Sequence, residues 1–578
     1  MRPEDIGLNS KDVLDEVVSN IEAFEAVHSP KLQRLQTAWD LYKGVPQASN
    51  RRELDGFANT FVYETPRIVD ALTATQMRML WSADPPFELR AQTPMTTAGT
   101  AYKMESLVRK QMEWIKYKRN LFRTIKSRFL IGTAFIEQPL MSGPIVMGMP
   151  TWESAGFVQR PINQVFFSPG AIDFDQADYS GTFDLITNFR LQQMLYADPG
   201  ASAWIPEGVA AAMQDSSPKL PQAVTTRLHA SSIYDFKNIK ELAVQYGTLK
   251  SDPYMREFVV GVINRQHLVK FHFPVIPGER PLRCSTFHWI EQEPYGWGIQ
   301  NDELIQRMLN ANRNRLFDLI TFSLYSMWKL DRFAGLDVRD AKIRPQNILL
   351  MDNIEGLQRL SPDINAANYG VKLDEILKEE LRSRHATPQA IQAIPQDITA
   401  TEVNAVTDSA QRIIGVDAEM FDEELVRPSI NYMVRTNSVF VDRNIWLSAT
   451  GDTGPVMITP EEAAHRFDVK TKLTTDKDFR PNRLRRLIEY IGTRTSFRNS
   501  FSRPINTDAI DEEIAKLFDI DPKRLLPPIQ PQQNFGDMMM QNFQQQQSRL
   551  GLINRERSLF GTPAPLPGSS ETPLPNEL

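Results

Sequence analysis

Residues that could carry out catalysis are sparse in this chain, and they do not occur at the spacings that known reactions require. The pattern G-x-x-x-x-G-K-[ST], whose backbone amides and lysine hold nucleotide phosphates, is absent. The patterns G-x-S-x-G, H-E-x-x-H and C-x-x-C are also absent, which argues against a serine hydrolase, a zinc protease and a dithiol redox protein. We therefore expect that the protein is not an enzyme and needs no cofactor.

Two groups of residues could be mistaken for metal sites. His267, His272, Cys284 and His288 lie within 22 residues, but the first two are five positions apart in a predicted strand and so point to opposite faces. The sequence "DFDQADYSGTFD", residues 173–184, has the carboxylates of a calcium loop without its glycine at position six or its glutamate at position twelve. Ordinary strand and turn chemistry explains both groups better, and we predict no metal.

The most strongly patterned region is acidic and covers residues 397–427. Thr399 and Glu402 have the spacing of a capping box, and apolar residues then recur at helical intervals. Eight carboxylates stand against two arginines, so the outer face of this helix of about thirty residues is strongly negative. Pro428 is expected to kink or end the helix. The carboxylates assigned to the outer face are Glu402, Asp408, Glu419, Asp422 and Glu423.

A neutral segment, "ATPQAIQAIPQD", precedes this helix and is predicted to be a loop. It contains no lysine or arginine, and Pro388 and Pro395 limit its backbone freedom. An ordinary helix connection is the alternative interpretation, because loops of this length are common. Its amide and apolar side chains are Gln389, Ile391, Gln392, Ile394 and Gln396.

Basic residues gather later, at 480–503, where seven arginines stand against one glutamate. Such a face can bind nucleic acid, but it lacks regularly interleaved aromatic residues, so solvation or pairing with acidic neighbours is favoured. The whole chain of 578 residues carries a net charge of −6, which argues against tight binding of nucleic acid over its entire surface.

Composition predicts an intracellularly made protein outside the membrane. The single cysteine, Cys284, excludes an internal disulfide framework. The N-terminal sequence has no apolar run typical of a secretory signal, and no stretch reaches 18 uncharged apolar residues. With 41% apolar residues, the chain can build a sizeable core.

The periodicity predicts an α+β fold that is predominantly helical. Three helical runs are expected, the first at 11–44, the second within 60–91 and closed by Asp84-Pro85-Pro86, and the third from 101 to Gly132, with a strand directly after Gly132. Short strands follow within 150–300, except for a helical and loop-rich part at 190–250. Helices are predicted at 301–330 and 368–384, with a small strand-and-loop module between them and a last strand within 463–474. From Pro522 the chain is low in complexity and is expected to be disordered.

Several local sequences occur in a distinctive order along these elements. They are "WDLYKG", "NTFVYETPRIVDALTATQMRMLWSADPPFEL", "TIKSRFLIGTAFIEQPL", "PYGWGI", "YSMWKLD" and "ITATEVNAVTDSAQRI". These sequences and the order of the elements resemble the portal proteins (head-to-tail connectors) of tailed bacteriophages, particularly those of short-tailed phages. The likeness covers about 20–450, and Ile131 stands where tyrosine is common in the family.

The resemblance implies the portal regions called wing, stem, clip and crown. The implied division is 1–300 wing (helices, then strands), 301–330 first stem helix, 331–364 clip, 365–385 second stem helix, 386–398 tunnel loop, 399–475 long wing helix and closing strand, 476–521 crown and 522–578 low-complexity tail. Arg339, Lys342 and Arg344 would then lie at the clip interface.

The resemblance also implies a structural function in the virion. The subunits would form a ring, expected to be a dodecamer, at the portal vertex of the capsid after assembly in the host cytoplasm. Double-stranded DNA would pass through its channel during genome packaging and ejection. The implied partners are the major capsid or scaffold protein, the terminase packaging motor and a tail adaptor.

In that setting the tunnel loop would face DNA with neutral side chains, and the acidic helix would prevent DNA from sticking to the channel. Alternatively, the carboxylates of this helix face solvent or arginines of a neighbouring subunit. Two other functions stay open: a genome-handling enzyme such as a packaging motor or nuclease, and another virion component such as a tail adaptor or minor head protein.

Overall fold

The computed structural model describes residues 2–45, 58–81, 84–92, 96–146, 149–150, 152–197, 204–214, 239–324, 327–330, 357–360, 365–385, 413–441, 445–448 and 455–472. All of them belong to the first of the two units into which the chain divides, Met1–Phe479 and Arg480–Leu578. The fold of this unit is mixed α+β with more helix than strand, which confirms the predicted class at that level.

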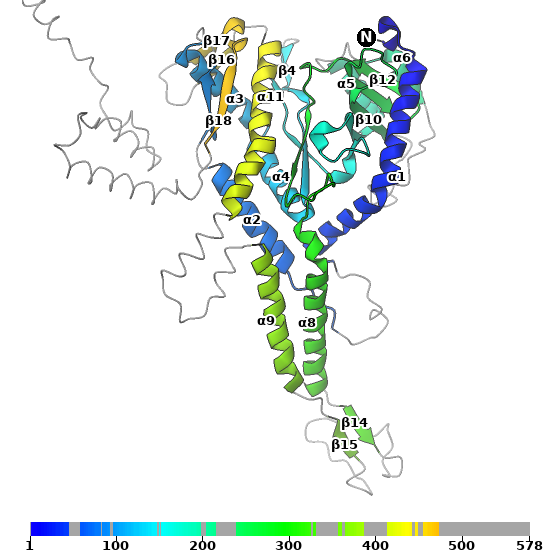
Figure 1. Ribbon diagram of the computed structural model, residues 1–578, viewed down its shortest axis with the longest axis vertical. Coiled ribbons are helices and arrows are strands. Elements are labelled where there is room, and N and C mark those ends of the chain that lie inside the picture. The colour runs from blue at the N-terminus through cyan, green and yellow to red at the C-terminus, as the bar shows by residue number, and fades with distance from the viewer. Residues whose placement is uncertain are drawn as a thin grey trace, which may run out of the picture. The chain divides into compact units, whose positions relative to one another are not determined.

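Helices form the N-terminal part, as predicted (Figure 1). The first begins after Asn9, whose side chain accepts a hydrogen bond from the backbone N–H of Lys11, and ends at Gly44 in the left-handed conformation. The third predicted run is two helices, because Lys116 has a φ of 55° and interrupts it. The helices are α1 (Ser10–Lys43), α2 (Glu64–Leu80), α3 (Ala98–Trp114) and α4 (Tyr117–Ile131).

A five-stranded antiparallel sheet in the order β12-β11-β10-β9-β8 holds much of the core. Its strands are β8 (Val165–Phe167), β9 (Tyr179–Thr187), β10 (Ile239–Thr248), β11 (Glu257–Ile263) and β12 (His267–His272). The predicted helical part at 190–250 is correct for α5 (Asn188–Ala197) and α6 (Pro206–Gln214) but wrong for the central strand β10. Both faces of β10 are buried, and polar Lys240, Glu241 and Gln245 within it hide the alternation that marks a half-buried strand.

A second sheet has the order β13-β2-β7, and five further strand pairs complete the described strands. Strand β2 follows Gly132 directly, as predicted. The sheet is built from β2 (Thr133–Glu137), β7 (Val158–Arg160) and β13 (Leu282–Thr286). The pairs are β1 (Phe87–Ala91) with β18 (Phe467–Thr471), β3 (Leu140–Ser142) with β6 (Glu153–Ala155), β4 (Ile145–Val146) with β5 (Met149–Pro150), β14 (Met327–Leu330) with β15 (Leu357–Leu360), and β16 (Ile445–Ser448) with β17 (Pro455–Ile458).

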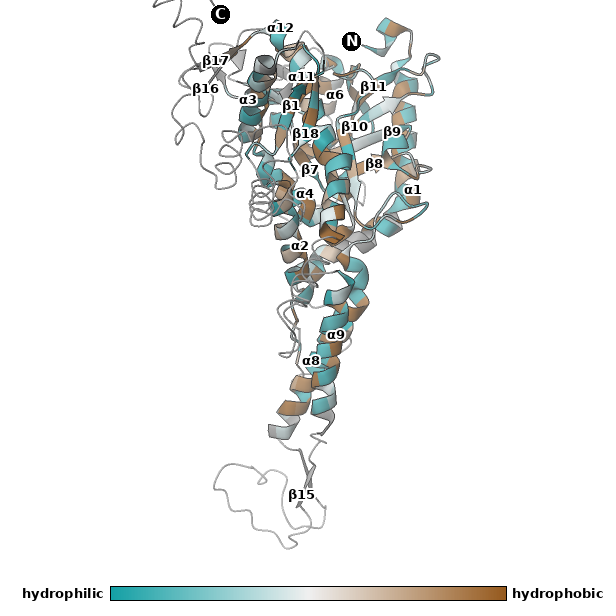
Figure 2. Ribbon diagram, turned by 60° about the vertical axis from the view of Figure 1, so that its left-hand side comes forward, coloured by the Kyte–Doolittle hydropathy of each residue, from teal (hydrophilic) through white to brown (hydrophobic). Residues whose placement is uncertain are grey.

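Two long helices, α8 (Glu303–Leu324) and α9 (Asn365–Arg384), lie side by side and antiparallel (Figures 1 and 2). The predicted helix through residue 330 is wrong at its end. The helix stops at Leu324, and the last four residues form β14, which pairs with β15 from the region expected to be the clip. The helical spacing of the apolar residues predicted that the helix continues to residue 330. Instead, the last four residues form a strand because they pair with β15.

The described part of the predicted acidic helix is continuous from 413 to Phe440. Residues 413–421 are α-helical, Asp422–Val426 form a π-helical turn, and α11 (Arg427–Phe440) follows without a break. Pro428 does not end the helix, because it comes directly after the π turn, where the regular i→i−4 hydrogen-bond ladder is already interrupted. A short helix, α12 (Pro460–Ala463), precedes the last described strand.

Among the described residues, no helix is both long and apolar enough to cross a lipid bilayer.

Candidate functional site

Residues 58–65, an extended segment that leads into the first turn of α2, run along one side of α8 and are held by a row of its side chains. Four side chains of α8, each four residues from the next, accept hydrogen bonds from backbone N–H groups of this segment. We call this row, Gln306, Asn310, Asn314 and Asp318, the α8 ladder. The donor and acceptor pairs are Ala58 with Asp318 (2.7 Å), Thr60 with Asn314 (2.7 Å), Val62 with Asn310 (2.9 Å) and Thr65 with Gln306 (3.2 Å).

The α8 ladder forms because the spacing of every fourth residue along α8 nearly matches the spacing of every second residue along the extended segment. Four helical residues rise about 6 Å, and two extended residues advance roughly 6.6 Å, so alternate N–H groups meet successive ladder positions. Where the segment enters α2, the step lengthens to three residues, from Val62 to Thr65. The ladder thereby gives partners to backbone groups that neither helix nor sheet satisfies.

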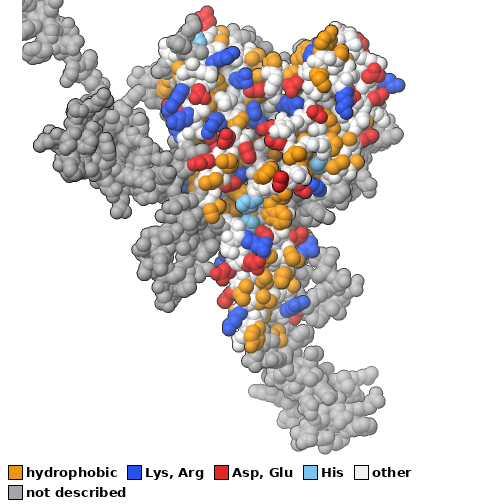
Figure 3. Space-filling model, viewed as in Figure 1, with side chains coloured by type: hydrophobic (Ala, Val, Ile, Leu, Met, Phe, Trp, Pro, Cys, Tyr) orange, Lys and Arg blue, Asp and Glu red, His pale blue; other side chains and the backbone are white. Residues whose placement is uncertain are grey.

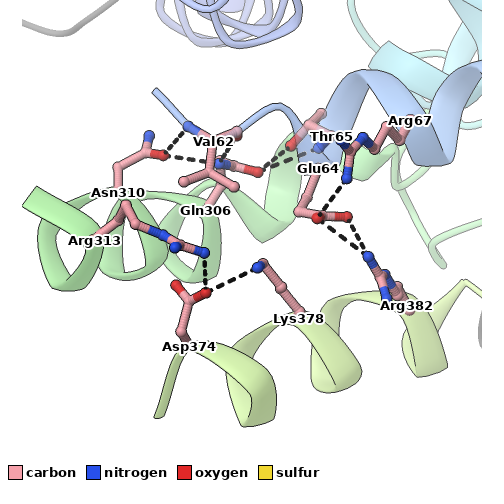
Figure 4. Close-up of polar contacts among 10 residues, drawn as sticks. All are labelled: Val62, Glu64, Thr65, Arg67, Gln306, Asn310, Arg313, Asp374, Lys378 and Arg382. Atoms are coloured by element: carbon pink, nitrogen blue, oxygen red, sulfur yellow. Dashed lines mark hydrogen bonds and ion pairs between the residues drawn. The ribbon is translucent and has the colours of Figure 1, made fainter. Parts of the chain in front are cut away.

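Gln306 is the most enclosed member of the ladder and is fully buried. Its Nε2 donates to the carbonyl oxygen of Val62 (2.6 Å) and to Oδ1 of Asn310 (3.1 Å), as Figure 4 shows. Its Oε1 accepts from the backbone and the hydroxyl of Thr65. Both ends of this amide are therefore used, and they fix where α2 begins relative to α8.

Charged groups tie α9 into the same junction (Figure 4). Glu64, the first residue of α2, is 1% exposed and accepts from Arg382 of α9 (3.1 and 3.2 Å) and from Arg67 (3.3 Å). A carboxylate at a helix N-terminus also interacts favourably with the helix dipole. Asp374 of α9 is buried and pairs with Arg313 of α8 and with Lys378 (2.8 Å).

A third carboxylate, Asp302, lies just before α8. It contacts Nε2 of His385 at 2.6 Å and accepts from Arg384 at 2.9 Å, so it joins the start of α8 to the end of α9. Burial raises the pKa of Asp302, but the hydrogen bonds and charges of His385 and Arg384 outweigh it and hold that pKa below its usual range. A buried carboxylate with two such partners stays ionised near neutral pH.

Glycines bring two distant parts of the chain together beside this junction. Gly132, with a φ of +92°, ends α4, and a Cβ there would lie 2.3 Å from the carbonyl oxygen of Gly296. A Cβ on Gly298 would lie 2.3 Å from the backbone nitrogen of Gly132. These glycines belong to the sequences "LIGTAF" and "PYGWGI", so the structure packs together two of the sequences on which the resemblance depends.

The hairpin of α8 and α9 exposes apolar side chains on its outer surface. On α9, Tyr369, Leu373 and Ile376 follow i, i+4, i+7 spacing, while Leu377 and Leu381 are buried. The described part of the chain has twenty-four large exposed hydrophobic residues, and eight of them lie on these two helices, with exposed fractions of 42–75%. Figure 3 shows hydrophobic side chains along the hairpin. We call them the hairpin surface: Leu304, Met308, Phe317, Ile320, Tyr369, Val371, Leu373 and Ile376.

The predicted acidic face is only partly exposed. Asp422 is wrong as an outward-facing residue, because it is fully buried, accepts from the hydroxyl of Thr471 (2.6 Å) and pairs with Arg427 (3.1 Å). Burial raises its pKa. The reason is that this side of the helix packs on β18 rather than facing solvent. Glu419 and Glu423 are exposed as predicted.

One further carboxylate of the acidic region, Asp417, is anchored rather than free. It forms two hydrogen bonds of 2.7 Å with the guanidinium of Arg128, which is 1% exposed and also donates to the carbonyl oxygen of Thr286. Phe421 lies 5.2 Å from the same guanidinium. The helix is thus fixed to α4 and β13 through a carboxylate that the sequence places among its acidic neighbours.

Other predicted site residues lie outside the described residues. They are Gln389, Ile391, Gln392, Ile394 and Gln396 of the tunnel loop, Glu402 and Asp408 of the acidic helix, and Arg339, Lys342 and Arg344 of the clip. The basic segment 480–503 also lies outside them.

Sequence reasoning missed the α8 ladder. Its signal was present as amide or acid side chains at 306, 310, 314 and 318, an i, i+4 repeat on a helix. The extended partner at 58–65 carries no pattern that pairs it with α8, so the ladder's role needed the structure.

The junction's polar groups contact one another. In the described part of the chain, no three His, Cys, Asp or Glu side chains gather as a metal site would require. The exposed apolar residues of the hairpin surface are available to contact another protein. Comparison of the chain with models of known protein families and with curated proteins finds no match.

Proposed function

We propose that this protein is a portal-type subunit that assembles into a closed ring at a capsid vertex. The observation that carries the proposal is the α8–α9 hairpin, which is braced by buried polar contacts at its base and apolar on its outer surface. A large apolar surface on a well-fixed element typically marks a protein interface. The order helix, small β module, helix is the order that the resemblance to portal proteins implies for a stem and clip.

The bracing supports a repeated assembly contact. Glu64, Asp302 and Asp374 each join two elements through a charged partner, so the hairpin keeps one orientation relative to α2. In a ring, every subunit meets the next through two different surfaces, and closure depends on a fixed rotation between them. Because its base is fixed, the hairpin would meet the neighbouring subunit at the same angle at every contact of the ring.

The proposed ring gives the two hairpin helices the role of a stem. Residues 301–324 and 365–385 would line the stem, the β14–β15 pair would belong to the clip, and the elements before 301 and after 413 would belong to the wing. DNA would pass through the channel. The packaging motor and tail adaptor would bind the clip, and capsid or scaffold protein would contact the wing.

The exposed carboxylates Glu419 and Glu423 fit this role in either of two ways. Facing the channel, they would repel phosphates and leave DNA free to move. Facing a neighbouring subunit, they would pair with its cations. The second arrangement is developed in the next subsection.

The proposal is tested by placing a charge on the hairpin surface. Ile376→Asp changes a residue that is 59% exposed, so the single chain should fold normally while the stem contact is lost. Ile172→Asp is the matched control, since Ile172 is 55% exposed and lies in a loop away from the hairpin. Mass photometry should show rings for the wild type and the control, and at least about tenfold fewer for Ile376→Asp. Equal assembly of both variants would contradict the proposal.

A further inference from the structure

A pocket with an apolar floor and a basic rim lies where α2, α3 and α4 meet. Its volume is about 970 Å³, and Met77, Trp81, Met112 and Phe122 are among the residues that line it. Phe122 is 41% exposed, although aromatic side chains favour burial. Such a space has the size and lining of a binding pocket.

The rim carries positive charge that is not neutralised locally. Six lysines and arginines line the pocket, against Asp84 and Glu113. Asp84 pairs with Arg109, and Glu113 pairs with Lys110. Four of the basic residues are exposed and have no carboxylate partner among the described residues: Lys116, Lys118, Arg119 and Arg123.

A surface with the complementary character lies on the helix at 413–421 and its π turn. Ile413, Val416 and Met420 follow i, i+3, i+7 spacing and are 59%, 58% and 49% exposed, so they form an apolar ridge. Glu419 and Glu423 flank the ridge, are exposed, and have no basic partner within the described chain. We call these five residues the acidic ridge.

We infer that the acidic ridge of one copy of this chain docks in the basic pocket of the next copy. Apolar side chains of the ridge would cover the floor formed by Trp81, Met112 and Phe122. The two carboxylates would meet the unpaired cations of the rim, and complementary charges of this kind set partner choice and register. The inference rests on the proposed ring, in which each subunit uses two different surfaces.

The occupant comes from a second copy because the ridge cannot move to its own pocket. Asp417, between ridge residues, is held by two hydrogen bonds to buried Arg128, and Phe421 is fully buried. The helix is therefore fixed on its own core with the ridge facing outward. A pocket and a ridge on one rigid unit produce a repeating contact from subunit to subunit.

A protein occupant is favoured over duplex DNA. Phosphates would satisfy the cations, but they would leave the floor of Met77, Trp81 and Phe122 without an apolar partner. A helix with both apolar and acidic residues satisfies the floor and the rim together. DNA binding at the pocket is therefore a competing outcome that the test must detect.

Cysteine crosslinking tests the contact in the full chain. The one native cysteine, Cys284, has its thiol pKa raised by burial, so it reacts slowly. The double variant Phe122→Cys with Met420→Cys should give, on mild oxidation, a ladder of covalent multimers beyond the dimer. Phe122→Cys with Val439→Cys is the control, because Val439 is 58% exposed on α11 but is not part of the ridge. Each single variant should give no ladder.

Charge reversal supplies an independent readout. Arg119→Glu with Arg123→Glu, or Glu419→Arg with Glu423→Arg, should each raise the concentration for half assembly by about tenfold or more. Combining all four changes should restore assembly, which misfolding could not do. Lys11→Glu with Lys43→Glu on α1 is the control and should assemble like the wild type.

The outcomes separate this inference from the proposed ring. Rings without a ladder for Phe122→Cys with Met420→Cys would overturn the docking and leave the ring standing. Absence of rings in the wild type would overturn the ring itself. Normal assembly of Arg119→Glu with Arg123→Glu, together with lost binding of a duplex oligonucleotide, would assign the pocket to DNA and overturn the docking.

Discussion

Buried charges in this protein join residues that are far apart in the sequence. Arg128 meets Asp417, Glu64 meets Arg382 and Asp302 meets His385. Removing one partner of such a pair leaves an unpaired buried charge, which costs more than the pair itself contributes. These pairs therefore specify one arrangement of the helices more than they add to stability.

His28 of α1 is a buried polar residue without such a partner. It is 3% exposed, its ring stacks on Phe24 with centroids 4.7 Å apart, and neither ring nitrogen has a hydrogen-bond partner among the described residues. Burial, with a contribution from the charge of Lys31, lowers the pKa of His28 to about 4. The imidazole is thus neutral in the folded protein above about pH 4.

This lowered pKa predicts a pH-dependent loss of stability. Between about pH 6.5 and pH 4 the unfolded chain binds a proton at His28 and the folded chain does not, so the free energy of unfolding falls as pH falls. The loss is on the order of 3 kcal/mol across that window, and His28→Phe should remove it. Urea unfolding of both proteins at pH 7 and pH 4.5 measures how much free energy of unfolding each one loses. The other titrating groups contribute equally to both proteins, so their contributions cancel in the comparison. An equal loss in both proteins would contradict the assignment.

Among helices and strands, the sequence was most informative where a local signal decided the structure. Gly44 and Gly132 end helices where expected, and the strand after Gly132 is present. Prediction failed where a segment becomes a strand only because it pairs with a distant part of the chain. Strand β10 depends on β9 and β11 for its hydrogen bonds, and β14 depends on β15. Neither pairing can be seen from periodicity within the segment.

The candidate site shows the same division. The spacing of Tyr369, Leu373 and Ile376 was visible in the sequence as part of an amphipathic helix. The sequence did not show which side of α9 packs against α8. That depends on contacts between the two helices, such as the hydrogen bond from Asn312 to the carbonyl oxygen of Gly370 (2.7 Å). Asp422 looked like its acidic neighbours until its contact with Thr471 placed it in the core.

The α8 ladder predicts a measurable local weakening. Gln306→Leu replaces the amide by an apolar side chain, so it leaves the N–H of Thr65 without a partner in a buried place. It also removes one of the two donors to the carbonyl of Val62, which keeps the N–H of Glu64. An unpaired buried N–H costs about 1–3 kcal/mol, so the free energy of unfolding should fall by roughly that amount. Hydrogen exchange at 60–65 should also speed up. Exposed Arg307→Leu is the control and should change stability by less than about 0.5 kcal/mol. Unchanged exchange in Gln306→Leu would show that the ladder does not hold the segment.

The protein exposes three features that the proposed ring would bury between subunits: the hairpin surface, the basic pocket and the acidic ridge. In the proposed ring, the hairpins would pack beside each other in the stem, and pocket and ridge would meet in the wing. Each contact then repeats at every subunit boundary, so modest individual contacts act together.

The most direct test is electron microscopy of the purified wild-type chain, combined with a mass measurement. We predict top views of closed rings with a central hole, which a heterologous contact forms when its rotation closes. The expected mass is about twelve times 66.0 kDa, because the resemblance to portal proteins implies a dodecamer. Particles that remain monomers and dimers over a wide range of protein and salt concentrations would contradict the proposed function.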